Sequence, residues 1–457
     1  MHLFGENQAR KLNAMMKQTQ HHQGNQWRVI REKKMSVRVY YSLYGRLLSL
    51  QALYEAFKRV KKNKGAAGVD GQSVQDFAQN LESNLKQLLL ELQEKRYQPQ
   101  PVKRVEIDKD DGSKRLLGIP TVRDRVVQQC LSEIMTPIFD PDFHPSSYGY
   151  RAGRSSHQAI SKATLFIRQY NRQHVVDMDL SKCFDMLDHD LIIQSVRKRI
   201  TDGSILKLID LFLKSGVMVG SSWQSNEKGS PQGGVISPLL ANIYLDAFDQ
   251  EMKRRQHRIV RYADDILILC GSEAAAKNAL KVARHILEET LKLKVNEHKT
   301  HIAHSDDGIK FLGVVIGTDY TRIQEKKLKA LKAKVKRITK RNGGKNLAEV
   351  LKELNPVLRG FVNYFKIANI SSVLKQLSGW IRRRLRSVQL KLWKKPGKLH
   401  RRLKQLGYKP PFKFIKMNSW RNAASPLASY AMPNDWFKEI GLYPIDEVKT
   451  GVLVPCL

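Results

Sequence analysis

The chain has 457 residues, of which 80 are Lys or Arg and 43 are Asp or Glu, so its formal net charge is +37 at pH 7. A hydrophobic fraction of 42% excludes wholesale disorder, and the length is enough for two or three domains that each bury a core. So large a positive charge favours a nucleic-acid partner over a merely solvated basic surface.

Cysteine usage and hydropathy bear on the compartment. The four cysteines stand far apart and none belongs to a CxxC pair, so the sequence supports neither a disulfide framework nor a Cys-rich zinc site and fits a reducing environment. No apolar run approaches the roughly 18 residues needed to span a bilayer, and the N-terminus lacks the apolar core of a secretory signal. We therefore expect a soluble cytoplasmic protein with no membrane partner, and leave its oligomeric state open.

The first 40 residues carry eight Lys or Arg against two Glu, which predicts a basic N-terminal arm with no core of its own. Helical patterns follow over residues 41–65 and 74–97; the first stops at a glycine and the second before two prolines. Residues 102–108 and 114–120 then flank the tetrapeptide KDDG, whose Asp-Gly step favours a hairpin of two short strands.

Strands and helices alternate from there to about residue 320. Residues 174–180 (HVVDMDL) predict a strand, residues 237–255 a long helix, and residues 258–270 (RIVRYADDILILC) a hairpin. Hairpins mixed with helices indicate an α+β fold with a palm-like sheet rather than a doubly wound parallel one.

Residues 321–398 are expected to form a module of basic helices. Strand signals vanish there, and residues 321–400 carry 23 Lys or Arg against three Glu, a net +20 that exceeds half of the charge of the chain. Charge runs on helices are usually solvated faces, but this imbalance is too large for internal pairing, so we prefer a phosphate-binding module. Residues 399–457 contain several prolines and are expected to form a small appendage, for which rudimentary DNA binding is one reading.

The segment RYADDILIL places two acids directly before four apolar residues. A hairpin turn can hold Asp264 and Asp265 at its tip within reach of solvent, and Asp177 and Asp179 near the end of the strand 174–180 offer a further acid. Carboxylates grouped in this way suit Mg²⁺, which takes one or two of them together with substrate phosphates. On the residues alone, acid pairs in turns are mostly structural. A metal site and a purely structural turn therefore both remain as hypotheses at this point.

Seven motifs in one order resemble the reverse transcriptases encoded by bacterial group II introns. The similarity covers about residues 45–395 and includes SSYGYRAGRSSHQA, GSPQGGVISPLLANIYLD, RYADDILIL and LKVNEHKT. The segment that ends in WIRRRLRSVQLKLWKK is similar to the thumb, or maturase, domain of the family. The resemblance implies a right-hand polymerase with fingers and an antiparallel palm sheet over residues 41–320, followed by an α-helical thumb.

The resemblance also implies catalytic roles. Asp179 and Asp264 would be the main ligands of two Mg²⁺ ions, with Asp265 close by as an auxiliary ligand. Phe184 would be a gate whose ring excludes a ribose 2′-hydroxyl, although it could instead simply pack the palm. Lys299 would protonate the departing pyrophosphate, unless it is an ordinary surface lysine.

Contacts with nucleotides and RNA are implied for further residues. Lys109 and Arg115 flank the expected hairpin tip and would grip the incoming dNTP, and a guanidinium is the better match to phosphate. Gln232, followed by two glycines, would lie beneath the templating base, although a plain turn would use the same residues. RNA contacts are expected from Arg151, Arg154, Arg382, Arg383 and Arg384.

The departures from the family pattern are few. Cys183 and Ala152 stand where relatives usually have an aromatic residue and a proline, and neither change removes a charged or metal-binding group. Cys456 is the sole cysteine beyond Cys270, so the zinc-supported HNH endonuclease that many relatives carry is not expected. In this respect the chain is similar to the class C intron proteins.

The function implied is an RNA-directed DNA polymerase that copies RNA into cDNA and binds its group II intron RNA as a maturase, assisting splicing and retromobility. Its partners would be intron RNA, an RNA template with a DNA or RNA primer, dNTPs and target DNA, in a cytoplasmic ribonucleoprotein or at the nucleoid. Two alternatives stay open: a splicing factor with a vestigial polymerase, and a free-standing enzyme domesticated for DNA repair or phage defence. Three intact acids, Asp179, Asp264 and Asp265, weigh against the vestigial site.

Overall fold

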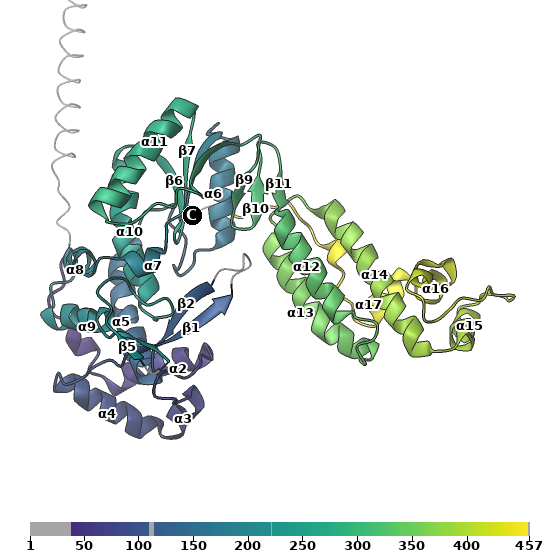
Figure 1. The fold of residues 1–457 in the computed structure, drawn as a ribbon, viewed down its shortest axis with the longest axis horizontal. Coiled ribbons are helices and arrows are strands. Elements are labelled where there is room, and N and C mark those ends of the chain that lie inside the picture. Colours follow the sequence, from purple (N-terminus) through teal and green to yellow (C-terminus); the bar gives the residue numbers. More distant parts are fainter. Residues whose placement is uncertain (1–37, 109–113, 221, 456–457) are drawn as a thin grey trace, which may run out of the picture.

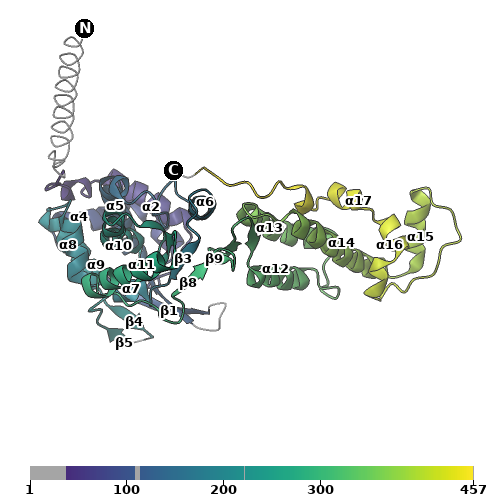
Figure 2. The same ribbon diagram turned by 90° about the horizontal axis from the view of Figure 1, so that it is seen from above.

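The computed structural model describes residues 38–108, 114–220 and 222–455. Figures 1 and 2 show a broad body of helices and sheets, from which a long group of helices extends to one side. Residues 1–37 of the expected basic arm and Lys109 at the expected hairpin tip lie outside the described residues.

A layer of helices begins the described chain. Its elements are η1 (Tyr44–Arg46), α2 (Leu50–Lys62), α3 (Val74–Gln79), α4 (Leu81–Gln93), α5 (Val122–Phe139) and η2 (Asp140–Asp142). Ser49 caps α2 by accepting a hydrogen bond from the backbone N–H of Ala52, and Leu53, Phe57 and Val60 recur along its one buried face. This face packs against α5, so the helices predicted from spacing exist and form a layer of their own.

A small sheet stands beside these helices, with strand order β2-β1-β4-β5. The strands are β1 (Val102–Asp108), β2 (Lys114–Ile119), β4 (Val217–Val219) and β5 (Ser222–Gln224). β1 and β2 pair antiparallel, with Ile107 opposite Arg115, which confirms the two strands predicted on either side of KDDG. Because β2 carries Arg115, this sheet decides where that guanidinium lies.

A second sheet has the order β6-β7-β3-β8 and is antiparallel throughout. Its strands are β3 (His174–Met178), β6 (Arg258–Tyr262), β7 (Asp265–Cys270) and β8 (His301–His304). The helices α10 (Ser237–Arg254) and α11 (Glu273–His285) contact it, as does α6 (Ser156–Arg168) (Figure 1). The antiparallel palm sheet and the α+β class expected from the sequence are thereby confirmed.

Both faces of the palm sheet are buried, which explains the continuous apolar run after the two acids. Ile266 and Ile268 belong to the core that includes α10 and α11, whereas Leu267 and Leu269 belong to the core that includes α6. Alternate residues of a strand point to opposite faces, so a strand covered on both sides reads as uninterrupted apolar sequence. The pairing of β7 with both β6 and β3 is fixed by this burial.

Shorter elements join these layers. They are α7 (Cys183–Met186), α8 (His189–Arg197), α9 (Gly203–Leu213), the π-helical turn η3 (Ile286–Thr290), and a three-stranded sheet of β9 (Ile309–Phe311), β10 (Val314–Ile316) and β11 (Thr321–Ile323). β9 and β10 pair antiparallel, as do β10 and β11. This small sheet leads from the palm into the thumb helices (Figure 1).

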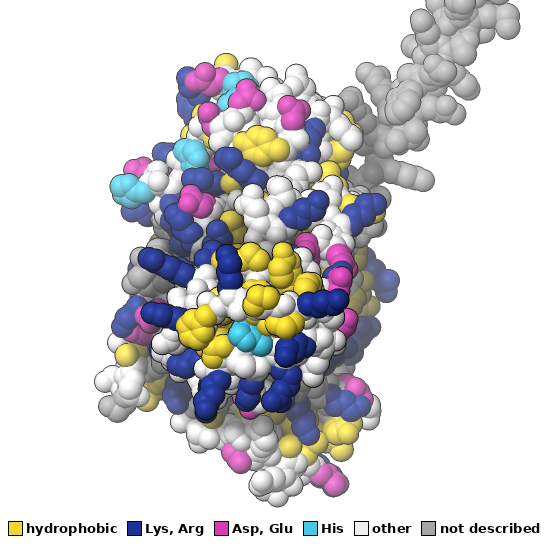
Figure 3. Space-filling model, turned by 90° about the vertical axis from the view of Figure 1, so that its right-hand side faces the viewer, with side chains coloured by type: hydrophobic (Ala, Val, Ile, Leu, Met, Phe, Trp, Pro, Cys, Tyr) yellow, Lys and Arg dark blue, Asp and Glu magenta, His cyan; other side chains and the backbone are white. Residues whose placement is uncertain are grey.

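The thumb consists of three long helices followed by shorter ones. They are α12 (Glu325–Ile338), α13 (Leu347–Phe365), α14 (Ser371–Trp393), α15 (Pro396–Gln405), η4 (Arg421–Ala424), α16 (Pro426–Ala431), α17 (Asn434–Glu439) and η5 (Ile445–Glu447). At the outer end of the thumb, Lys and Arg side chains surround a cluster of hydrophobic ones (Figure 3). The residues beyond α14 pack on the thumb through Leu399, Leu403 and Phe437, so they extend the thumb core.

The last described residues return from the outer thumb to the palm, as Figure 2 shows. Asp446 accepts a hydrogen bond from Arg382 at 3.0 Å, and Gly451 donates its N–H to the Lys366 carbonyl at 2.8 Å. Val454 donates its N–H to the hydroxyl of Ser161 in α6 at 3.1 Å. We call residues 446–454 the strap, because they connect α14, α13 and α6 in turn.

Among the helices formed by the described residues, not one combines the length and the apolar character that crossing a bilayer would require.

Candidate active site

Asp179 directly follows β3 and is held by the turn of residues 296–300. Its carbonyl accepts the backbone N–H of Asn296 at 2.9 Å, and its carboxylate accepts the side-chain amide of Asn296 at 3.2 Å. Lys299 forms an ion pair with the same carboxylate at 3.0 Å. Asp179 also donates its N–H to the hydroxyl of Thr300 at 3.4 Å. The motif NEHKT therefore serves as a cradle that fixes the orientation of Asp179.

The turn between β6 and β7 brings the other two acids to the same place. Met178 pairs with Ile266 across the sheet, so one further step of the antiparallel register sets Asp179 opposite Asp265. Asp264 lies at the tip of the turn, whose last ladder pair is Tyr262 with Asp265. The structure thus gathers the three predicted carboxylates at one end of the palm sheet.

Electrostatics report the same proximity. Desolvation and then the negative charges of Asp264, Asp179 and Asp177 raise the pKa of Asp265 to about 7. Burial, followed by the charge of Asp179, also raises the pKa of Asp264, and Arg115 and Lys299 oppose this rise. A bound cation would relieve the repulsion between the carboxylates, which is the second cause of the rise in the pKa of Asp265.

The donor set fits Mg²⁺ that is shared with a substrate. Among the residues described here, no three or more His, Cys, Asp or Glu side chains are grouped as a closed metal site. Mg²⁺ does not need such a cage, because it commonly takes one or two carboxylates and completes its octahedron with water and phosphate oxygens. The charge of Asp179 raises the pKa of Asp264, so the two carboxylates lie close enough to serve as such a pair.

A buried arginine shapes the acid turn, although the sequence pattern predicts only a strand position for it. Arg261 is fully buried and makes a bidentate pair with Asp249, with contacts of 2.9 and 2.6 Å. It also donates to the side chain of Asn242 at 3.0 Å and to the carbonyl of Ala263 at 3.1 Å. Ala263 has φ of +58°, so this bond stabilises a strained residue immediately before Asp264.

A polar stripe on α10 was the available signal for this network. Asn242 and Asp249 are seven residues apart, which places both on one face of the helix, and both are buried there. A buried asparagine and a buried aspartate in one stripe require a partner. The sequence offered Arg261 as that partner, seven residues after the C-terminal end of α10.

Phe184 and Tyr150 meet beside the carboxylates. Phe184 is 9% exposed on α7, and the ring centroid of Tyr150 lies 6.1 Å from its own at an interplanar angle of 78°. Tyr150 is 57% exposed, and burial of its hydroxyl followed by the charge of Asp264 raises its pKa. Gly149 allows the backbone next to Tyr150 to lie close to the acid turn, because a Cβ there would lie 2.3 Å from the backbone nitrogen of Ala263. Tyr150 is a site residue to which sequence reasoning assigned no role, although it lies within the quoted motif SSYGYRAGR.

The loop of Gln232 packs against the strand that carries Arg115. The carbonyl of Gln232 accepts the N–H of Gly118 at 2.6 Å. Gly233 has φ of +114°, and a Cβ on it would lie 2.5 Å from the Gly118 carbonyl, so glycine is required there. Arg115, three residues earlier on β2, is exposed and lies near enough to Asp264 and Tyr150 to influence both. Lys109 lies outside the described residues.

The expectation that Arg151 contacts template phosphates is corrected by the structure. Arg151 is 8% exposed, and all five of its guanidinium N–H groups are used within the protein. The acceptors are the carboxylate and carbonyl of Asp140 and the carbonyls of His144 and Ser147. Arg154 differs, because it makes one hydrogen bond to the Pro145 carbonyl and lies over the ring of Tyr148.

The three thumb arginines also divide into packed and open residues. Arg382 is paired with Asp446 of the strap, and Arg384 donates to Thr339 and to the Lys336 carbonyl while lying over Trp380 and Trp420. Both are therefore engaged within the thumb, and the phosphate contacts expected of them stay a prediction. Arg383 is exposed and keeps an open face beside Trp420.

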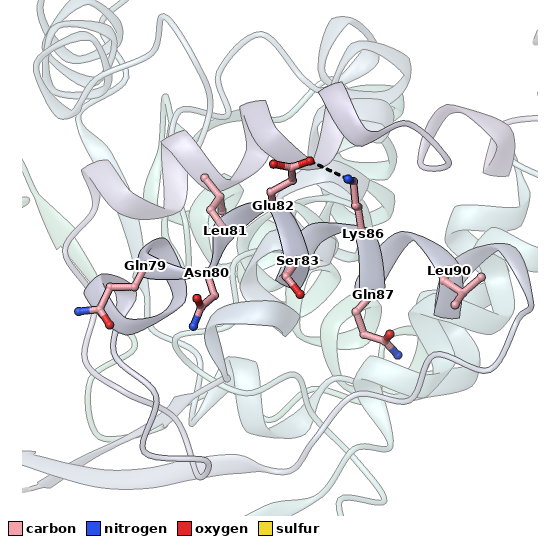
Figure 4. Close-up of a pocket in the computed structure, with 8 residues that line it drawn as sticks. All are labelled: Gln79, Asn80, Leu81, Glu82, Ser83, Lys86, Gln87 and Leu90. Carbon is pink, nitrogen blue, oxygen red and sulfur yellow. Dashed lines mark ion pairs between the residues drawn. The ribbon is translucent and has the colours of Figure 1, made fainter.

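A surface hollow on α3 and α4 is a poor candidate for the chemistry. It is lined by polar and aliphatic side chains of residues 79–90, with one ion pair between Glu82 and Lys86 at 2.6 Å (Figure 4). In Figure 1 these helices lie at the far end of the body from the β6–β7 turn. No acid pair or strained backbone accompanies the hollow, so we assign it no role.

Comparison with known proteins agrees with the geometry. Residues 107–316 match the family described as reverse transcriptase (RNA-dependent DNA polymerase), and residues 328–407 match the group II intron maturase-specific domain. Protein YkfC of Escherichia coli (strain K12) is 37% identical over 300 residues, which cover 57% of this chain and 79% of YkfC.

A second relative extends further along the chain. Group II intron-encoded protein LtrA of Lactococcus lactis subsp. cremoris is 29% identical over 409 residues, which are 75% of this chain and 65% of LtrA. This chain therefore spans less than two thirds of LtrA. The solved structure of telomerase from Candida albicans with a telomeric RNA fragment is 12% identical, with a TM-score of 0.41 over 68% of this chain and 63% of that one, which is too low to add to the assignment. The sequence matches show that the chain belongs to the group II intron-encoded reverse transcriptases, in which an RNA-dependent DNA polymerase is joined to a maturase-specific domain.

Proposed function

We propose that this reverse transcriptase copies RNA into cDNA at the cleft where the end of β3, the β6–β7 turn and the 296–300 turn meet. The observation that carries the proposal is the strand register, which sets Asp179 opposite Asp265 and beside Asp264. Asp179 and Asp264 would hold two Mg²⁺ ions, with Asp265 as an auxiliary ligand. When bound, Mg²⁺ activates the primer 3′-hydroxyl and stabilises charge on the departing pyrophosphate.

Lys299 is the proposed proton donor to pyrophosphate. Its ammonium lies 3.0 Å from the carboxylate of Asp179, while its side chain is 62% exposed. An exposed ammonium beside a metal-ligand carboxylate can turn toward an incoming phosphate oxygen without losing a buried interaction. The cradle formed by Asn296 keeps the turn in place while Lys299 moves.

The remaining groups are proposed to position the nucleotide. Arg115, on the fingers strand β2 and near Asp264, would contact the triphosphate of the incoming dNTP. Phe184, supported by the edge of Tyr150, would exclude a ribose 2′-hydroxyl. The loop of Gln232, tied to β2 through Gly118, would support the templating base.

The thumb is proposed to hold structured intron RNA, and thereby to assist splicing and retromobility at a DNA target in a cytoplasmic ribonucleoprotein. The maturase-specific match spans α12 to α15. On α12, exposed basic side chains occur at Lys326, Lys332, Lys334, Lys336 and Arg337. A helix with this many open cations provides phosphate contacts that the packed arginines Arg382 and Arg384 do not.

Primer extension on an RNA template with dNTPs tests the catalytic proposal. Asp264→Asn should abolish extension while leaving RNA affinity nearly unchanged, because it removes a metal ligand from a cleft whose RNA contacts lie elsewhere. Asp307→Asn is the matched control, since Asp307 is an exposed aspartate in another turn, and it should extend normally. Activity of the Asp264 variant equal to that of the control would overturn the assignment, and intact acids with working extension argue against a vestigial site.

A further inference from the structure

A second hollow lies at the end of β6 remote from the carboxylates. Its walls come from the C-terminal half of α6 and the residues that follow it, from residues 253–259 at the junction of α10 and β6, and from residues 144–146. The acid turn follows the other end of β6, so the length of this five-residue strand, about 15 Å, separates the two places. The hollow is therefore not part of the polymerase cleft.

The hollow is positively charged and has no counter-charge of its own. Lys162, Arg172, Lys253 and Arg258 line it, and none of the lining residues is acidic. Within the described part of the chain, none of these four side chains forms an ion pair with a carboxylate. Cations that converge without acids repel one another, and a bound anion relieves that repulsion.

The buried histidine at the floor of the hollow reports this field. Burial lowers the pKa of His144, and the charges of Lys253, Arg261 and Lys162 lower it further, against the opposing charge of Asp249. Its Nδ1 accepts the N–H of Ser146 at 3.0 Å, so the ring is fixed. Lys162 and Lys253, from different helices, thus act on the same point in space.

The end of α10 that borders the hollow is closed by hydrogen bonds within the chain. The carbonyl of Glu251 accepts the N–H of residue 255, that of Met252 the N–H of residue 257, and that of Lys253 the N–H of residue 256, so the last turn of the helix is capped internally. Gln256 takes φ of +62° to complete this cap. Lys253 and Arg258 lie on either side of this cap, and both line the hollow.

An aromatic pair provides a stacking surface beside the cations. Phe166 is 7% exposed, whereas Tyr170, one turn later, is 58% exposed. Their ring centroids are 5.9 Å apart at 67°, and Lys162 lies 5.3 Å from the centroid of Phe166. The buried ring holds the exposed ring by its edge, which leaves a tyrosine face open to a nucleic-acid base.

We propose that this hollow binds one nucleotide of an RNA strand, with the phosphate against Lys253 and Arg258 and the base against Tyr170. The site is additional to the polymerase cleft and to the thumb. An RNA strand suits the hollow better than a free nucleotide, because four of its contact residues, Tyr170, Arg172, Lys253 and Arg258, lie open on its rim. A pocket for a free triphosphate would instead enclose the phosphates with backbone N–H groups.

Equilibrium binding of a fluorescent RNA of about 40 nucleotides, followed by anisotropy over a range of salt concentrations, tests the proposal. Lys253→Ala with Arg258→Ala should weaken binding at least tenfold. Because the two cations contact one phosphate, and each phosphate contact on single-stranded RNA contributes about 0.7 to the salt slope, the slope should fall by about 0.7. The charge-matched control is Arg197→Ala with Lys198→Ala, two exposed cations on α8 and its C-terminal cap, which should keep the wild-type slope. Equal losses in the two variants would overturn the proposal, since general electrostatics would then explain both.

The stacking contact is tested separately. Tyr170→Ala should reduce RNA affinity about tenfold, and Tyr170→Phe should retain it, because stacking needs the ring and not the hydroxyl. RNA that contains 4-thiouridine should photo-crosslink to the peptide with Tyr170 in the wild type. Absence of that crosslink would overturn an RNA-strand site. So would a crosslink that is lost on addition of 1 mM (roughly saturating) AMP but kept on addition of unlabelled RNA.

The failure of this inference is distinguishable from failure of the proposed function. The hollow variants should extend a short primer on its RNA template at the wild-type rate, because that duplex lies within the polymerase cleft. Loss of RNA affinity with normal extension is the expected result. Wild-type protein without primer extension would overturn the polymerase proposal and leave the binding test intact, whereas slowed extension in the hollow variants would overturn a separate site.

Discussion

Arg261 is the side chain on which the geometry of the acid turn depends most directly. It is fully buried, and its charge is balanced by Asp249 alone, while its remaining donors hold Asn242 and the carbonyl of Ala263. A buried pair of this kind contributes little over an apolar substitute, but breaking it leaves an uncompensated charge. The network therefore fixes the conformation of the turn, and it adds little to the free energy of unfolding beyond what apolar side chains would give.

Replacement of Arg261 by Met should lower the free energy of unfolding by about 3–5 kcal/mol, because Asp249 would stay buried without its partner. Urea denaturation followed by circular dichroism measures the loss. Adding Asp249→Leu to the same chain should restore much of the stability, since both charges are then absent. Primer extension should stay impaired in the double variant, because the carbonyl of Ala263 still lacks its donor. A double variant with full activity would show that the turn does not need this bond.

The contact between Tyr150 and Phe184 leads to a second prediction. Phe184→Ala should raise incorporation of rNTPs relative to dNTPs at least tenfold, because the ring proposed to exclude the ribose 2′-hydroxyl is removed. Tyr150→Ala should change the ratio in the same direction but less, as the ring of Phe184 would lose the support of its edge contact. Single-nucleotide extension with each substrate measures the ratio. Phe139→Ala, a buried phenylalanine of α5, is the control and should leave the ratio unchanged even if it lowers stability. An unchanged ratio in the Phe184 variant would favour the packing role.

Asp246 gives a prediction for pH. Burial, and then the charge of Asp249, raise its pKa to about 6, above the ordinary value of 3.8. Because the folded pKa is raised, the neutral acid favours the fold at low pH, and this contribution is lost as the pH rises through 6. The stabilisation of Asp246→Asn over the wild type, measured as free energy of unfolding, should thus be about 1–2 kcal/mol larger at pH 8 than at pH 5. A shift of one pKa unit corresponds to about 1.4 kcal/mol. Thermal denaturation at both pH values checks it, and a difference independent of pH would contradict it.

At the scale of elements, the basic charge of the thumb is divided between an open helix and a packed one. Lys332→Ala with Lys336→Ala on α12 should weaken binding of structured RNA and lower the salt slope by roughly 1.5, because two phosphate contacts are removed. Arg382→Ala with Arg384→Ala on α14 removes the same charge but should mainly lower the melting temperature, as these side chains hold Asp446 and Thr339. Filter binding and thermal denaturation of both variants separate the effects. A pattern with the helices reversed would contradict the division.

Much of the fold could be predicted because its elements follow simple periodicities. The run after Asp264 and Asp265 indicated a buried strand, and the Asp-Gly step indicated the β1–β2 hairpin, whose paired strands the structure confirms. The placement of Asp179 near Asp264 was also predictable, since strands that end in acids are brought together by a single sheet. Local pattern and topology agree in this part of the chain.

The partners of individual arginines could not be predicted from the sequence. Arg151 and Arg382 are as basic as Arg154 and Arg383, yet the first two are paired with Asp140 and Asp446. Asp446 lies 64 residues from Arg382, so no local pattern connects them. Whether an arginine is paired with an acid inside the protein depends on long-range contacts, which the composition of a segment does not show.

At the scale of the whole molecule, the strap connects the outer thumb to the palm. Gly451 has φ of +78°, and a Cβ on it would lie 2.7 Å from the side-chain amide of Asn369. Gly451→Ala should therefore loosen residues 446–454 and speed hydrogen exchange there and in α6. Gly441→Ala is the control, because Gly441 has a similarly positive φ of +91° but nothing within 4 Å of the added carbon. Equal exchange in the two variants would show that backbone strain alone, and not the clash at the strap, is responsible.

The apolar core on the α6 face of the palm sheet does not end at the palm. It runs from Leu267 and Leu269 of β7 through Leu354 and Leu385 of the thumb as far as Phe437. Because the thumb and the palm sheet share this core, the thumb should not unfold separately. Heating should therefore give a single transition in which thumb and sheet unfold together. The thumb is therefore anchored in the palm sheet. A force on its outer end is transmitted through this core to β7, the strand that begins with Asp265.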